Sequence, residues 1–162
     1  MSLLEWCQWL QNSSLGTSIR ESGYTYPLIE GTHVLGLALS VGTIMWFDLR
    51  LLGLAMRRDA VSKVFAQVQP WMLAGFAIMF TTGALLFTAR AEDAYNSTYF
   101  RIKAGLLVLG AVNVLVFHAT VDRQRAAWDV GRPPFRARMA GLISLVLWFG
   151  IIAAGRIMAY NL

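Results

Sequence analysis

The fold is decided by residues 26–54, which read YPLIEGTHVLGLALSVGTIMWFDLRLLGL. Residues 27–47 of this stretch are apolar enough to cross a bilayer, because about 20 residues at a rise of ~1.5 Å span a hydrocarbon core roughly 30 Å thick. Glu30 and His33 nevertheless lie inside one end of this apolar run. Polar side chains within a spanning helix are costly and mark functional sites by default. We therefore expect a transmembrane helix that carries functional residues near one membrane surface.

The composition of the chain is that of a membrane protein. Of its 162 residues, 57% are hydrophobic and only 14% are charged, whereas about a quarter of the residues of an average soluble domain are charged. The single cysteine, Cys7, excludes a disulfide within the chain and a metal site built from several cysteines. The net charge of +5 does not indicate nucleic acid binding, because the basic residues flank apolar runs as topology signals do. We expect the lipid bilayer as a partner and no nucleic acid.

Four apolar runs predict four membrane spans, at about 27–50, 68–88, 102–119 and 139–160. Residues 1–25 carry an apolar stripe with tryptophan but no uninterrupted apolar core, which predicts a short amphipathic helix on the membrane surface instead of a signal peptide. The expected fold is all-α: an antiparallel four-helix membrane bundle over residues 26–162, preceded by an interfacial helix in residues 1–25.

Basic residues are distributed unevenly between the two ends of the predicted spans. One end holds nine of them: Arg50, Arg57, Arg58, Lys63, Arg123, Arg125, Arg132, Arg136 and Arg138. The other end holds five, diluted by acidic residues: Arg20, Arg90, Arg101, Lys103 and Arg156. The positive-inside rule places the loops after the first and third spans in the cytoplasm. We therefore expect a multi-pass protein of a bacterial inner membrane with both termini in the periplasm.

The direction of the spans sorts the polar residues into two layers. The outer layer contains Tyr26, Glu30, His33, Lys103 and Arg156, and the inner layer contains Asp48, Arg50, His118 and Asp122. His33 and His118 should lie about 20 Å apart along the bundle, so one protomer cannot hold a single haem between them. In the inner layer, we expect His118 to be an interfacial residue, and Asp48 and Arg50 to anchor the end of the first span.

The outer layer predicts a functional site of one of three kinds. Tyr26, Glu30 and His33 follow i, i+4, i+7 spacing and share one helix face. His33 could ligate a haem iron, with Lys103 or Arg156 pairing the propionates and with Tyr26 or Glu30 as hydrogen-bond partners. Alternatively, Glu30, Lys103 and Arg156 form a structural ion pair that His33 completes. The third hypothesis is a proton relay through Glu30 and His33.

The segments IEGTHVLGLAL, FDLRLLG and NVLVFH resemble an uncharacterised bacterial family of small four-span proteins. More distantly, the chain resembles the HemJ-type protoporphyrinogen oxidases and the CopD-type copper-resistance membrane proteins. The likeness to HemJ-type proteins rests on His33 early in the first span, Arg50-Leu51 near its end, Lys103 at the start of the third span and His118 at its end. It implies haem b bound through His33 and a role for Lys103 in activity.

The expected function is that of a b-type haem protein with a redox role, which handles electrons between the haem and a quinone, a porphyrin or a partner protein. Glu30 and Lys103 are the candidate catalytic residues. The sequence shows no second axial ligand, so it is absent or comes from another protomer, and we expect a homo-oligomer or a subunit of a membrane complex. The alternatives are a non-catalytic subunit of a larger complex and a small proton or solute transporter that uses Glu30, His33 and Lys103.

Overall fold

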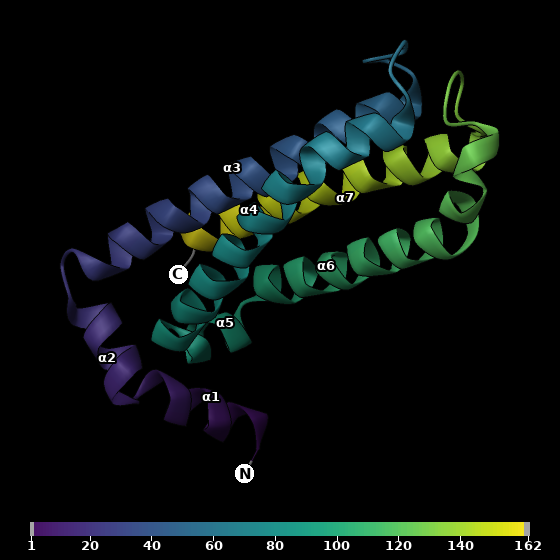
Figure 1. The fold of residues 1–162 in the computed structure, drawn as a ribbon. Helices are drawn as coiled ribbons and strands as arrows, with labels where there is room; N and C mark the ends of the chain where they lie inside the picture. Colours follow the sequence, from purple (N-terminus) through teal and green to yellow (C-terminus); the bar gives the residue numbers. More distant parts are fainter. Residues whose placement is uncertain (1, 161–162) are drawn as a thin grey trace.

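The computed structural model describes residues 2–160, without the side chains of Gln124 and Arg125, and this part of the chain is helical and has no strand (Figure 1). Its elements are α1 (Leu3–Gln11), α2 (Ser14–Glu21), α3 (Thr25–Leu52), α4 (Val61–Ala89), α5 (Ala91–Asn96), α6 (Thr98–Val116), a π-helical turn (Phe117–Val121), a 3-10 helix (Asp122–Ala127) and α7 (Phe135–Tyr160). The predicted bundle domain ends at residues 161–162, which lie outside the described part. The side chain of Arg125, one of the nine basic residues that predict the topology, also lies outside it.

Within residues 2–160, four helices are long and apolar enough to cross a membrane: α3, α4, α6 together with the π-helical turn, and α7. The prediction of an all-α membrane bundle is therefore confirmed. Helix α4 begins at Val61, before the predicted start of the second span at about residue 68, so the helix is longer than the apolar run that predicted the span. Pro70 lies inside α4, where it leaves the carbonyl of Ala66 without its helical N–H partner.

The four long helices form an open bundle. Helix α3 packs along both α4 and α7, and α6 packs along α7, whereas the backbones of α4 and α6 lie apart and the two helices meet through the stacked rings of Phe87 and Phe100 (Figure 1). Gly75 of α4 permits the closest of these approaches, since a Cβ atom there would lie 2.5 Å from the backbone nitrogen of Ser40 in α3. We call the end of the bundle where α3 begins and α7 ends the terminal side, and the opposite end the loop side.

The short N-terminal helices dock on the terminal side, at the corner between α4 and α5. Nη1 of Arg20 donates hydrogen bonds to the carbonyl oxygens of Gln11, at 3.0 Å, and Ala89, at 3.2 Å. Gly16 packs so closely that a Cβ atom there would lie 2.9 Å from the carbonyl oxygen of Thr88. These contacts hold α1 and α2 against the bundle, while their location at a membrane surface stays a prediction.

On the loop side, one buried arginine ties two loops together. Helix α3 ends at Gly53, whose φ of 72° lies in the left-handed region that favours glycine. Arg50, in the last turn of α3, has no exposed surface. Its Nε donates to the carbonyl oxygen of Asp59 at 2.9 Å, and its Nη2 donates to that of Gly131 at 3.2 Å. Arg50 therefore anchors the end of the first span, as predicted, through backbone carbonyls of both loops.

Candidate functional site

His33 lies on the terminal side of α3 and contacts α4 through Thr82. Its Nδ1 is 2.9 Å from the hydroxyl oxygen of Thr82. The Thr82 hydroxyl donates its one hydrogen to the carbonyl oxygen of Ile78, at 2.6 Å, so it accepts from the Nδ1–H of His33. In the neutral imidazole, this assignment leaves the lone pair on Nε2. Gly83 makes room for the ring, since a Cβ atom there would lie 3.2 Å from Cε1 of His33.

Lys103 of α6 brings a positive charge to the same level of the bundle. Its side chain is partly buried and lies within electrostatic range of His33. The Nζ atom sits over Gly155 of α7, 3.5 Å from where a Cβ atom would be. Among the described residues, Lys103 has neither a hydrogen-bond nor an ion-pair partner. An unpaired ammonium in an apolar span is costly, so an anionic group at this point would be stabilised.

Glu30 lies near these two residues, but the structural ion pair that the sequence offered as an alternative is not formed. Glu30 is partly buried and within electrostatic range of His33. In the described part of the chain, no ion pair joins Glu30 to Lys103 or to Arg156. The carboxylate of Glu30 and the ammonium of Lys103 thus form no ion pair with each other, although both lie within electrostatic range of His33.

The two other predicted residues of the outer layer, Arg156 and Tyr26, contact side chains that the sequence did not place in the site. Arg156 is exposed, with its guanidinium 5.0 Å above the ring of Tyr160 and its Nη2 3.2 Å from the Tyr160 hydroxyl. Tyr26 packs under the guanidinium of Arg90, at 5.4 Å from the ring centroid. The structure therefore places Lys103 and Glu30 within electrostatic range of His33 and Tyr26 within electrostatic range of Glu30, whereas Arg156 pairs with Tyr160.

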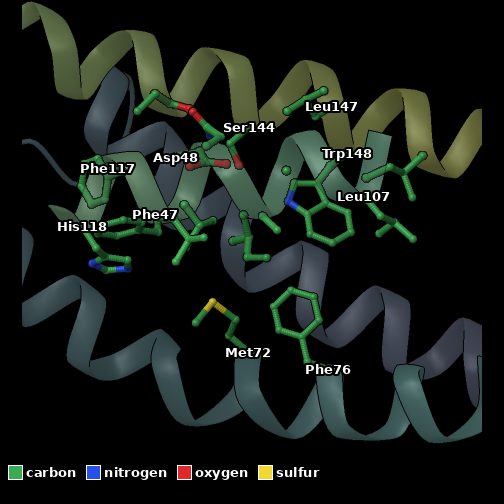
Figure 2. A pocket seen from close by; sticks show the side chains of 18 of the residues that line it. Phe47, Asp48, Met72, Phe76, Leu107, Phe117, His118, Ser144, Leu147 and Trp148 are labelled. Atoms are coloured by element: carbon green, nitrogen blue, oxygen red, sulfur yellow. The ribbon is translucent and has the colours of Figure 1, made fainter. Parts of the chain in front are cut away.

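A cavity of about 410 Å³ lies between α3, α4, α6 and α7, at the place where α4 and α6 diverge (Figure 2). Its aromatic lining consists of Phe47, Phe65, Phe76, Phe80, Phe117 and Trp148. Leu107 lines it four residues, or one helical turn, from Lys103, and Phe80 lines it two residues from Thr82. The cavity therefore extends from just below the His33 layer towards the loop side.

Asp48 lies in the wall of this cavity. Its position there was not predicted from the sequence. Only 4% of its surface is exposed, and its Oδ2 has no hydrogen-bond partner among the described residues. Ser144 of α7 faces the same carboxyl group (Figure 2). The prediction that Asp48 anchors the span end is therefore wrong, because Arg50 alone bonds to the loops. The signal in the sequence was the spacing of Gly36, Ser40 and Asp48 by four and eight residues, which puts small and polar residues on one buried face.

His118 lies at the loop-side end of the cavity, where α6 passes into the π-helical turn. Its Nδ1 is 3.0 Å from Oδ2 of Asp122, and its ring contacts those of Phe65 and Phe117. The side chain is 43% exposed, which agrees with a residue at the span end, although it also lines the cavity. His118 is 15 residues from Lys103, or about 22 Å along the helix. Because Lys103 lies at the level of His33, the two histidines of a protomer are too far apart for one haem to bridge them.

The fold and these polar residues define a multi-pass helical membrane protein with a histidine–lysine pair near the terminal side and an apolar cavity beneath it. Its sequence matches the family of unknown function DUF6644 over residues 6–161, and the chain belongs to that family. No curated protein and no solved structure matches it. The predicted membership of an uncharacterised family is thus confirmed, while the distant likeness to HemJ-type and CopD-type proteins stays a prediction.

Proposed function

We propose that the protein binds haem b through His33 and serves as an electron-transfer protein of a bacterial inner membrane. The observation that carries the proposal is the hydrogen bond from Nδ1 of His33 to Thr82. Histidines that ligate metals almost always donate their other ring N–H to an acceptor, which fixes the ring and the tautomer. His33 is held in this way, with Nε2 left as the electron-pair donor.

The donor set fits a b-type haem with one axial ligand from this chain. Lys103 provides an unpaired cation that a propionate would neutralise through a charge-assisted hydrogen bond. When bound, haem supplies one-electron redox chemistry, and charges near it shift its potential. His118 lies too far away to act as a second ligand, so a second ligand would be absent or would come from another protomer in a homo-oligomer or a larger membrane complex.

A quinone is the electron partner that the cavity favours. The lining is almost wholly apolar, and the backbones of α4 and α6, which flank it, lie apart, so a lipid-soluble ring can reach it from the bilayer. In the described part of the chain, Oδ2 of Asp48 is a buried acceptor without a donor, and a small rotation of the carboxyl group towards the cavity would let a quinol hydroxyl supply one. Replacing Asp48 with Asn should weaken binding of a short-chain quinol in detergent, and unchanged binding would remove the quinone from the proposal.

The proposed orientation follows from the charges on the loop side, where nine basic residues cluster. The loop at Arg57 and the loop at Arg132 would face the cytoplasm, and both termini would face the periplasm. His33 and Lys103 would then lie near the periplasmic surface, and the cavity would extend towards the cytoplasmic surface.

The absorption spectrum of the purified protein tests the haem proposal. We expect a Soret band that sharpens and shifts when dithionite is added, either as isolated or after reconstitution with haemin. A colourless preparation that takes up no haemin contradicts the proposal and favours the non-catalytic accessory subunit.

A further inference from the structure

A second pocket lies on the loop side, away from His33 and from the apolar cavity. It has a volume of about 490 Å³ and is lined by the end of α3, the two loops and the start of α7. Four of its lining residues are arginines, namely Arg50, Arg57, Arg132 and Arg138, and no acidic residue lines it. Guanidinium groups keep their charge in proteins, so this pocket is cationic at any pH at which the protein is folded.

Two of these guanidinium groups have buried donors without acceptors. Arg50 is fully buried and donates from Nε and Nη2 to loop carbonyls, and its Nη1 has no partner within the part of the chain that the structure describes. The Nε of Arg138 is likewise buried and unpartnered. Buried donors are almost always satisfied in native proteins, and a buried charge needs a counter-ion. In the described part of the chain, no ion pair with a carboxylate supplies one to any of the four arginines.

The backbone around the pocket is shaped to admit a ligand. Gly53 and Gly131 both line it, and both have positive φ, at 72° and 117°. Neither glycine would have a neighbour within 4 Å of an added Cβ atom, so the space beside them is open. The two hydrogen bonds of Arg50 hold its guanidinium in place, so part of the recognition geometry exists before a ligand binds.

We propose that this four-arginine pocket binds a phosphate group, carried by an anionic phospholipid or as free phosphate. The guanidinium group of an arginine can donate two parallel hydrogen bonds to phosphate oxygens, as the exposed Arg57 and Arg132 would here, and a small shift would bring the unpaired donors of Arg50 and Arg138 into contact. The pocket lies at the end of the spans, where lipid headgroups are found, and basic pockets between membrane helices are known headgroup sites. Bound phosphate would join α3, α7 and both loops.

Calorimetric titration in an uncharged detergent tests the proposal with three probes: short-chain phosphatidylglycerol, inorganic phosphate and a short-chain diacylglycerol, which lacks phosphate. The test variants are Arg132→Gln and Arg138→Gln. The matched control is Arg58→Gln, which removes an exposed arginine that does not line the pocket. Arg50 is left unchanged because its hydrogen bonds hold the loops together.

We expect phosphatidylglycerol or phosphate to bind, each test variant to weaken that binding at least about tenfold, and the control to leave it unchanged. Binding of phosphatidylglycerol alone identifies a lipid headgroup site, and tight binding of inorganic phosphate identifies a site for the free anion. The proposal is overturned if neither phosphate compound binds, if diacylglycerol binds equally well, or if the control variant loses as much affinity as the test variants. The comparison of the three probes on the unaltered protein gives a result even if a variant does not fold.

Discussion

Replacing Gly75 with Ala should push α4 away from α3 and destabilise the bundle. The new Cβ atom would lie 2.5 Å from the backbone nitrogen of Ser40 and 2.9 Å from the carbonyl oxygen of Gly36. These are backbone atoms that no rotamer change can move, so the helices must separate by roughly 1 Å to restore ordinary contact. Such overpacking typically costs about 1–3 kcal/mol. The same separation would lengthen the hydrogen bond from His33 to Thr82, two turns further along α4.

The assay is reversible unfolding in mixed micelles, with Gly42→Ala as the matched control. Gly42 also lies in α3, but an added Cβ atom would meet no neighbour within 4 Å. There the substitution removes the entropic cost of glycine in a helix and should stabilise the protein by about 0.5–1 kcal/mol. The two substitutions should therefore have opposite signs. If Gly75→Ala proved as stable as Gly42→Ala, the close packing of α3 on α4 would be refuted.

Three further predictions concern the terminal side and the orientation. Thr82→Val removes the acceptor for Nδ1 of His33 and should lower haem affinity roughly 10- to 100-fold, measured by haemin titration, whereas unchanged affinity would show that the hydrogen bond does not support ligation. Lys103→Met should leave the protein pale or shift its reduction potential, while Lys103→Arg should be nearly normal, and equal behaviour of the two in a redox titration would exclude a role for the charge. A reporter that is active only in the cytoplasm should be silent when fused after Leu162, and activity there would invert the proposed topology.

Much of the architecture follows from the sequence, because hydropathy and helix length are properties of each span alone. The four spans and the terminal-side position of His33 and Lys103 were predictable, since each residue opens a span that starts on the same side. The start of α4 was not, because Ser62, Lys63 and Gln67 resemble loop residues although the helix continues through them. Hydropathy marks where a span can end, and a helix can continue beyond that point.

The details of the functional sites depend on how the helices pack, which hydropathy does not encode. Thr82 is one of several threonines in apolar helices, and only the approach of α4 to α3 makes it the partner of His33. The burial of Asp48 likewise depends on the packing of α3 against α7, where Ser144 faces its carboxyl group and Gly141 permits a close approach to its backbone. The convergence of Arg50 from the end of α3 and Arg138 from the start of α7 depends on the fold of two loops. In each case the residue type was visible in the sequence, but its partner was not.

The most direct test of the central claim is the haem content of His33→Ala, compared with His118→Gln in the same preparation. The first substitution removes the proposed iron ligand, and the second changes the other histidine of the chain, at the opposite end of the bundle. The account predicts that His33→Ala is colourless after reconstitution with haemin, while His118→Gln keeps the haem content and spectrum of the unaltered protein. Full haem content with an unchanged spectrum in His33→Ala would contradict it.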